Sequence, residues 1–207
     1  DDPRITKADF LDTSISYKKD RCIIGNPPYG TRNTLSVKFF KKAIQLGDYV
    51  SFILPISQYE NNQQMYEFDL IYSEDLGVQT YTDRSLNCCL NIYKRPDNGV
   101  LNSKPKNSLK DLTIIEYRRG GRTDIPPGYD YVMGAFGAGC VGKPVDRMGK
   151  YALECYFYIN NVQLKDDILQ ALKNSDSKTL PKGISDTYRL PQWKILKRLR
   201  ESVPNIQ

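Results

Sequence analysis

The strongest constraint on the fold of this chain is a short apolar run that ends in two prolines. Residues 22–25 (Cys-Ile-Ile-Gly) are typical of a strand, and Asn26, Pro27, Pro28 and Tyr29 follow them directly. Each proline fixes φ and removes a backbone donor, so a strand cannot continue through the pair. The carbonyl oxygens of the resulting turn stay available to a ligand. With the side-chain oxygen of Asn26 and the aromatic face of Tyr29, the turn suits a flat group that carries an amino nitrogen.

The residues after the turn predict an α/β order. Apolar residues recur at helical spacing between Ser36 and Leu46, and Gly47 ends that segment. A strand is predicted at residues 49–54, closed by Pro55. This strand, helix and strand order indicates part of a doubly wound sheet, whose ligand site lies at the carboxyl ends of its strands.

The string Gly-Asn-Pro-Pro-Tyr-Gly at residues 25–30 resembles the catalytic motif of S-adenosylmethionine-dependent amino-methyltransferases, above all the N6-adenine DNA methyltransferases. Residues 8–11 (Ala-Asp-Phe-Leu) are similar to the preceding motif of that family, and residues 86–94 are similar to its late sheet strand. The resemblance covers about the first 95 residues. It implies a partial doubly wound, Rossmann-like methyltransferase sheet, with S-adenosylmethionine as the cofactor.

The resemblance implies that the catalytic residues are Asn26, Pro27, Pro28 and Tyr29. The side-chain oxygen of Asn26 and the carbonyl of Pro27 would accept the two hydrogens of an adenine amino group, which lets the nitrogen lone pair localise toward the methyl donor. Positioning and electrostatics would then supply most of the catalysis. An adenine within duplex DNA is out of reach of such a turn, so the base would be flipped out and stacked on Tyr29, with Tyr81 as a weaker second candidate.

The same resemblance assigns Asp9 and Phe10 to cofactor binding, because the acidic residue of the family motif contacts the adenine of the cofactor. Taken alone, Asp9 would equally serve as a helix cap, and Tyr29 as a core residue. The chain has no histidine, which excludes Ser-His, Cys-His and histidine-ligated metal chemistry within its 207 residues, and we expect no metal.

The chain departs from the family order upstream of Asp9. The glycine-rich cofactor loop and the ribose-binding acid of the family precede this motif, but only eight residues precede Asp9 here. We therefore expect either a missing upstream segment or a permuted order. Residues 137–142 have G-x-G-x-x-G spacing and Glu154 follows them, but a helix through residues 140–151 would contain two glycines and a proline. A glycine-rich loop in a target-recognition region is the favoured interpretation.

The second half of the chain has a different character. Residues 96–108 are rich in turn formers, so we predict one domain at residues 1–97 and a smaller α+β target-recognition region at residues 98–207. Strands are predicted there at residues 112–117 and 152–159. A short helix is predicted at residues 166–173, and an amphipathic helix begins at Pro191, with its apolar side packed on the domain and Lys194 on the other side.

Three arginines in this region, Arg118, Arg119 and Arg122, flank two glycines in a basic stretch. Such a loop suits contact with DNA phosphates, and a solvated basic loop is a nearly equal alternative. The five cysteines lack C-x-x-C spacing, which indicates reduced thiols in a cytoplasmic protein. No apolar stretch has the length of a membrane span.

Three classes of function remain open. The leading one is a site-specific N6-adenine DNA methyltransferase, acting on double-stranded DNA in a restriction-modification system. The same tetrapeptide occurs in enzymes that methylate glutamine side chains of protein release factors. The third is a truncated, non-catalytic module that binds DNA or a partner subunit and has lost the cofactor. As partners of the chain we expect double-stranded DNA and either a partner subunit or a missing upstream segment.

Overall fold

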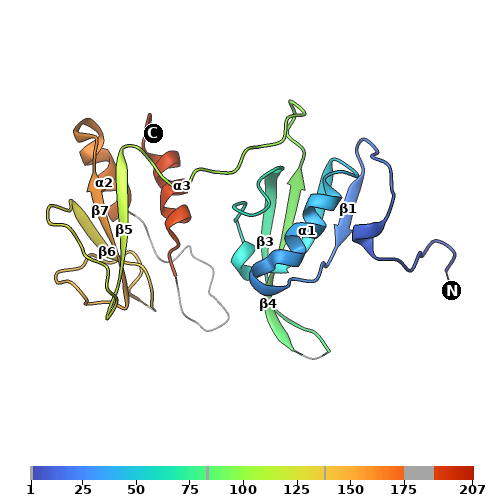
Figure 1. Cartoon of the computed structure of the whole chain (residues 1–207), viewed down its shortest axis with the longest axis horizontal. Helices are drawn as coiled ribbons and strands as arrows, with labels where there is room; N and C mark the ends of the chain where they lie inside the picture. The colour runs from blue at the N-terminus through green and yellow to red at the C-terminus, as the bar shows by residue number, and fades with distance from the viewer. Residues whose placement is uncertain (1, 83, 138, 175–188) are drawn as a thin grey trace. The chain divides into compact units, whose positions relative to one another are not determined.

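The computed structural model describes residues 2–82, 84–137, 139–174 and 189–207 (Figure 1). The chain divides into two compact units, Asp1–Pro105 and Lys106–Gln207, each with its own sheet and core. The predicted boundary between residues 97 and 98 lies a little earlier in the same irregular segment, which extends from the end of one sheet to the start of the other. The predicted α/β class is confirmed: the first unit contains a mixed sheet and the second unit contains a further sheet with two helices.

The first unit is a four-stranded mixed sheet in the order β1-β2-β4-β3. The strands β1 and β2 are parallel, as the strand, helix and strand order predicted, whereas β4 runs antiparallel to both of its neighbours. The elements of this unit are η1 (Phe10–Asp12), β1 (Cys22–Gly25), η2 (Thr31–Asn33), α1 (Thr34–Ala43), β2 (Tyr49–Pro55), η3 (Ile56–Gln58), β3 (Asp69–Thr80) and β4 (Ser85–Lys94).

The core of the first unit lies between α1 and the sheet. Phe40 of α1 is fully buried and meets Tyr93 of β4 edge to face, with 4.9 Å between ring centroids. A second edge contact joins Phe40 to Phe68 at 6.0 Å. Offset and edge-to-face pairs of this kind add about 0.5–1.5 kcal/mol beyond the apolar area that they bury. These contacts hold α1 in place, and the turn after β1 leads directly into that helix.

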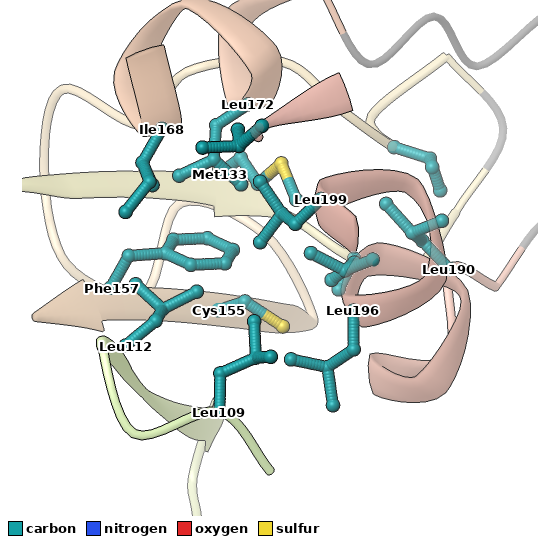
Figure 2. Packing of buried hydrophobic residues seen from close by; sticks show 14 of the residues in the cluster. Leu109, Leu112, Met133, Cys155, Phe157, Ile168, Leu172, Leu190, Leu196 and Leu199 are labelled. Atoms are coloured by element: carbon teal, nitrogen blue, oxygen red, sulfur yellow. The ribbon is translucent and has the colours of Figure 1, made fainter. Parts of the chain in front are cut away.

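The second unit is an antiparallel three-stranded sheet in the order β5-β7-β6. Its elements are β5 (Leu112–Arg118), β6 (Tyr131–Gly134), β7 (Leu153–Ile159), η4 (Val162–Leu164), α2 (Lys165–Lys173) and α3 (Gln192–Ser202). Strands β5 and β7 and both helices agree with the predicted segments. Figure 2 shows the core, in which Phe157 and Met133 of the sheet face Ile168 of α2 and Leu199 of α3.

The C-terminal helix buries the apolar face that its sequence predicted, with one exception. Ile195, Leu196 and Leu199 are each 1% exposed. Lys194 was expected on the opposite, solvated side, but it is buried at 8% exposure. That prediction was wrong: Lys194 lies in the first turn of α3 and is covered there, although consecutive helix residues do not face the same side. Its long aliphatic stem allows this position, since lysine stems commonly cover apolar surface.

The glycine-rich segment after β6 is not a permuted cofactor loop. Within the described residues no helix begins in this segment, and the next element is β7. The chain folds back on β6 instead: the Gly134 N–H donates to the Lys143 carbonyl and the Gly142 N–H to the Gly134 carbonyl, both at 2.9 Å. Glu154, the alternative ribose-binding acid, is fully buried. Its carboxylate accepts bonds from the backbone of Gly149 and Tyr151 and from the Tyr156 hydroxyl, so this buried group is engaged within the unit and is not exposed to a ribose.

Across the part of the chain that the structure describes, no helix combines the length and the apolar character that a membrane span requires.

Candidate active site

The Asn-Pro-Pro-Tyr turn leaves the sheet at the carboxyl end of β1, where Gly25 pairs with Phe52 of β2. Two hydrogen bonds then fasten the turn to the start of α1. The Ser36 hydroxyl donates to the Pro28 carbonyl, and the Leu35 N–H donates to the Tyr29 carbonyl, each at 3.1 Å. The turn is therefore held by the first turn of α1 as well as by the sheet.

The remaining acceptors of the turn are the ones that the sequence assigned to catalysis. Pro27 is buried, yet no described residue donates a hydrogen bond to its carbonyl oxygen. Asn26 is exposed, so its side chain can reach a ligand. The carbonyls of Pro28 and Tyr29 already accept hydrogen bonds from residues of α1. The free carbonyl of Pro27 and the side-chain amide oxygen of Asn26 are therefore the acceptors left for a bound amino group.

Gly30 follows Tyr29, and its backbone conformation determines how the chain leaves the turn. Its backbone has φ of 67° and ψ of 178°, a combination that is accessible essentially to glycine alone. A Cβ at this position would lie 2.8 Å from Cγ of Leu35, which is closer than carbon atoms approach. Any side chain here would therefore displace the start of α1 or change the turn.

We predict that Gly30→Ala destabilises the first unit by about 1–3 kcal/mol, the usual cost of one residue held in such a region. Chemical denaturation checks the value. Gly99→Ala is the matched control, because Gly99 also has a positive φ, of 74°, but has open space where a Cβ would stand. Equal losses for the two variants would show that contact with Leu35 does not constrain the turn.

Three polar groups form a ring beside the turn. The Tyr29 hydroxyl donates to Oδ1 of Asn26 at 3.4 Å, and Nδ2 of Asn26 donates to the Tyr81 hydroxyl at 3.3 Å. The two hydroxyls are 3.3 Å apart, so Tyr81 completes the ring as a donor to Tyr29. Hydroxyl bonds to oxygen normally measure about 2.7–2.8 Å, so these contacts are long and weak. A ligand with a better donor can displace them.

Cys88 of β4 lies behind the ring. Its sulfur is 3.5 Å from the Tyr29 hydroxyl and 3.8 Å from the Tyr81 hydroxyl. Burial, followed by the hydrogen bond with Cys88, raises the pKa of Tyr29 far above its usual value. Tyr29 is consequently a neutral phenol at physiological pH, and it can donate a proton to a hydrogen bond without carrying a charge.

The turn and the β3–β4 hairpin enclose a cavity of about 150 Å³. The four turn residues line one side, and Tyr81, Arg84 and Leu86 line the other. Pockets that hold whole drug-sized ligands have about 300–1,000 Å³, so this cavity suits a single flat ring system. Of the hairpin residues, the sequence predicted only Tyr81, as a second stacking candidate.

The tyrosine opposite the turn provides a test of the ring. Tyr81→Phe removes one hydroxyl and keeps the aromatic face, so we expect the rate of methyl transfer to fall about 2- to 10-fold, the equivalent of one hydrogen bond of ~0.5–1.5 kcal/mol. The affinity for DNA should stay unchanged. Tyr72→Phe is the matched control, since among the described residues the Tyr72 hydroxyl bonds only to exposed Glu74, at 2.9 Å. If the Tyr81→Phe variant transfers methyl groups as fast as the Tyr72→Phe control, the Tyr81 hydroxyl has no role in the site.

The residues predicted to bind the cofactor lie elsewhere on the first unit. Asp9 caps η1, with Oδ1 accepting the Leu11 N–H at 2.9 Å, and Phe10 stacks on Phe39 of α1 with 5.4 Å between centroids. Neither residue lines the cavity beside Asn26. The helix-cap role is thus present, and the cofactor role stays a prediction.

The three predicted DNA-binding arginines are in the second unit. Arg118 ends β5, and Arg119 follows it with its N–H donating to the Ala152 carbonyl at 3.1 Å. Arg122 lies beyond the Gly120 turn, and all three side chains are exposed. Arg118 and Arg119 share a cavity, which Arg122 does not line.

No protein-family model and no curated protein matches this sequence. Among solved structures, part of the chain resembles a proposed RNA methyltransferase from Pyrococcus horikoshii, with a TM-score of 0.33 and 14% sequence identity. The alignment covers 42% of this chain and 47% of that protein, so the chain spans about half of its length. Similarity at this level defines no function, so a function for this chain has to be argued from the chemistry of the site.

Proposed function

We propose that this chain contains the catalytic turn and the DNA-recognition region of an S-adenosylmethionine-dependent, site-specific N6-adenine DNA methyltransferase of the restriction-modification type. Residues 1–97 would form part of the catalytic domain, and residues 98–207 would bind double-stranded DNA. One observation supports this most strongly: Oδ1 of Asn26 and the uncommitted carbonyl of Pro27 flank a cavity with the size of one ring system and a tyrosine on each side.

The proposed chemistry needs two acceptors and no general base of unusual pKa. The exocyclic nitrogen of adenine is a poor nucleophile, because its lone pair is delocalised into the ring. Asn26 and Pro27 would each hold one of its hydrogens, which favours a nitrogen whose lone pair points at the methyl donor. An entering amino group would replace the long contact between Tyr29 and Asn26, so little stabilisation is lost when the base binds.

S-adenosylmethionine would supply the methyl group when bound. Of the residues assigned to it, Asp9 fits the adenine end, because only one of its carboxylate oxygens is engaged by a described residue. The glycine-rich loop that would hold the rest has no counterpart in the described residues of Asp1–Pro105. The first unit by itself therefore provides part of a cofactor site.

A partner subunit or an upstream segment would complete that site beside β1. This strand is at the edge of the described sheet, and Ile24 on it is 78% exposed. An unpaired strand edge with an apolar side chain is normally covered or paired in natural proteins. A further strand paired with β1 would stand next to Asn26 and could carry the missing loop.

Calorimetric titration of the protein with S-adenosylmethionine tests whether a complete cofactor site exists. Binding, followed by methyl transfer to DNA, would support the proposal. Transfer to a glutamine peptide in place of DNA would identify the protein-methylating class. An absence of cofactor binding, combined with salt-sensitive DNA binding, would identify a non-catalytic module.

A further inference from the structure

A second cavity, in the unit Lys106–Gln207, has no part in the catalytic turn. It encloses about 340 Å³ and is lined by Arg118, Arg119, Phe136, Ala152, Leu153 and Arg189. Three guanidinium groups and one phenyl ring thus border a single hollow. The basic stretch of the sequence indicated two of these arginines, but Phe136 and Arg189 come from distant segments.

Backbone pairing holds the walls of this cavity. Arg118 pairs with Leu153 across β5 and β7. On the other side, Phe136 and Arg189 form an antiparallel bridge, and the next residue along, Leu190, donates its N–H to the Ala135 carbonyl at 2.9 Å. Because each charged side chain stems from a hydrogen-bonded segment, the cavity is formed before any ligand enters.

The charge around the cavity is mostly uncompensated. Nη2 of Arg189 is 3.6 Å from a carboxylate oxygen of Glu116, and both side chains are partly exposed, so this pair is weak. Within the described residues, neither Arg118 nor Arg119 forms an ion pair. Guanidinium groups are planar forks that match phosphate oxygens. The cavity therefore favours a phosphate-bearing ligand.

Phe136 indicates what accompanies the phosphate. This ring lines the cavity and is 37% exposed, so part of it is accessible to a ligand. Aromatic rings next to basic side chains are the combination that binds unpaired nucleotides, since each base can stack while its phosphate is neutralised. The volume lies at the lower end of the range for ligand pockets, about 300–1,000 Å³, which limits the ligand to about one nucleotide.

We infer that this cavity binds one unpaired nucleotide of a DNA strand, with its phosphate between Arg118, Arg119 and Arg189 and its base against Phe136. The inference rests on the proposed function in taking DNA as the ligand, but it requires no methyl transfer. It adds Arg189 and Phe136 to the DNA-binding residues, and it gives the second unit a specific preference for DNA that contains an unpaired base.

Fluorescence anisotropy with labelled DNA tests the inference on the full chain. One duplex carries a single bulged nucleotide and the other is fully paired, and both are titrated over a range of salt concentrations. We expect tighter binding to the bulged duplex. Arg189→Gln should weaken binding of both duplexes and reduce the slope of log affinity against log salt by at most about 0.7–0.9, the value for one whole phosphate, because Arg118 and Arg119 still contact the same group. Phe136→Ala should weaken bulge binding roughly 5- to 150-fold, the range for one stacked base, and leave that slope unchanged.

Control variants distinguish the loss of phosphate contact and base stacking from a general loss of positive charge or apolar surface. Arg147→Gln and Met148→Ala remove an exposed charge and an exposed apolar side chain outside the cavity, and both should bind like the wild type. Phe136→Leu keeps an apolar side chain without the aromatic face, and it should lose bulge preference even if the alanine variant fails to fold.

Three results would overturn the inference: equal affinity of the wild type for bulged and paired duplexes, full bulge preference in Phe136→Leu, or binding of deoxyadenosine monophosphate as tight as binding of the bulged duplex. The last result would identify a site for free nucleotides. Because none of these measurements uses methyl transfer, a chain that methylates nothing can still show the bulge preference, and failure of the proposed function is distinguishable from failure of this site.

Discussion

Replacing Asn26 with alanine should reduce methyl transfer by about 10²–10³-fold, the usual effect of removing one preorganised polar group that stabilises a transition state. The physical reason is the loss of Oδ1, one of the two acceptors that would hold the amino group. The Pro27 carbonyl would remain, so one hydrogen of the nitrogen would still be held. Initial rates with labelled cofactor on DNA measure the effect.

The same variant should bind DNA nearly as well as the wild type. Asn26 is exposed and belongs to the first unit, whereas the arginines that would contact phosphates are in the second. Asn107→Ala is the matched control, because Asn107 is also exposed and lies outside both cavities. A large loss of DNA affinity in Asn26→Ala, with transfer per bound DNA unchanged, would contradict the catalytic assignment.

Neutralising Arg118, Arg119 and Arg122 together should weaken DNA binding strongly and flatten its dependence on salt. Each phosphate contact contributes about 0.9 to the slope of log affinity against log salt on duplex DNA. Loss of the phosphate that Arg118 and Arg119 would share and of one that Arg122 would contact should therefore lower the slope by ~1.8. Binding isotherms of the triple glutamine variant at several salt concentrations give this slope directly.

A second triple variant controls for net charge alone. Lys143, Arg147 and Lys173 are exposed residues of the same unit and do not line the arginine cavity. Replacing all three with glutamine removes the same charge, and it should change the slope far less. Equal slopes for the two triple variants would mean that the Arg118–Arg122 stretch attracts DNA only through overall charge and does not touch phosphates.

The sequence predicted the elements whose apolar pattern is strong. The strand before the prolines, α1 and β2 lie where the pattern placed them, and β4 lies where the family resemblance placed a strand. These segments are anchored by large buried residues such as Phe40 and Tyr93. The helix was expected to extend to Leu46, but α1 ends at Ala43 and the chain continues in a turn before Gly47.

The long strand β3 was not predicted. Its sequence includes Asp69, Glu74, Asp75 and Gly77, and its pairing with β4 shifts register twice. Such a strand at a sheet edge has no regular alternation of buried and exposed residues, so its sequence lacks the apolar periodicity from which a strand is predicted. This omission hid much of the candidate site, because the β3–β4 hairpin brings Tyr81, Arg84 and Cys88 to the catalytic turn.

The arginine cavity could not have been predicted for the same kind of reason. Arg118 and Arg189 are distant in the sequence, and they line one hollow only because Arg189 pairs with Phe136, which follows β6. Short motifs identify residues that act within one turn, such as Asn26 and Pro27. They do not identify side chains that meet through long-range pairing.

Mass spectrometry of nucleosides from DNA incubated with the protein and S-adenosylmethionine tests most directly whether Asn26 and Pro27 hold the amino group of adenine. With the wild type, N6-methyladenine should accumulate, and with Asn26→Ala it should fall by at least about a hundredfold. Methylation of a glutamine peptide in place of DNA would contradict the proposed reaction. So would N6-methyladenine that forms at the same rate in the Asn26→Ala variant.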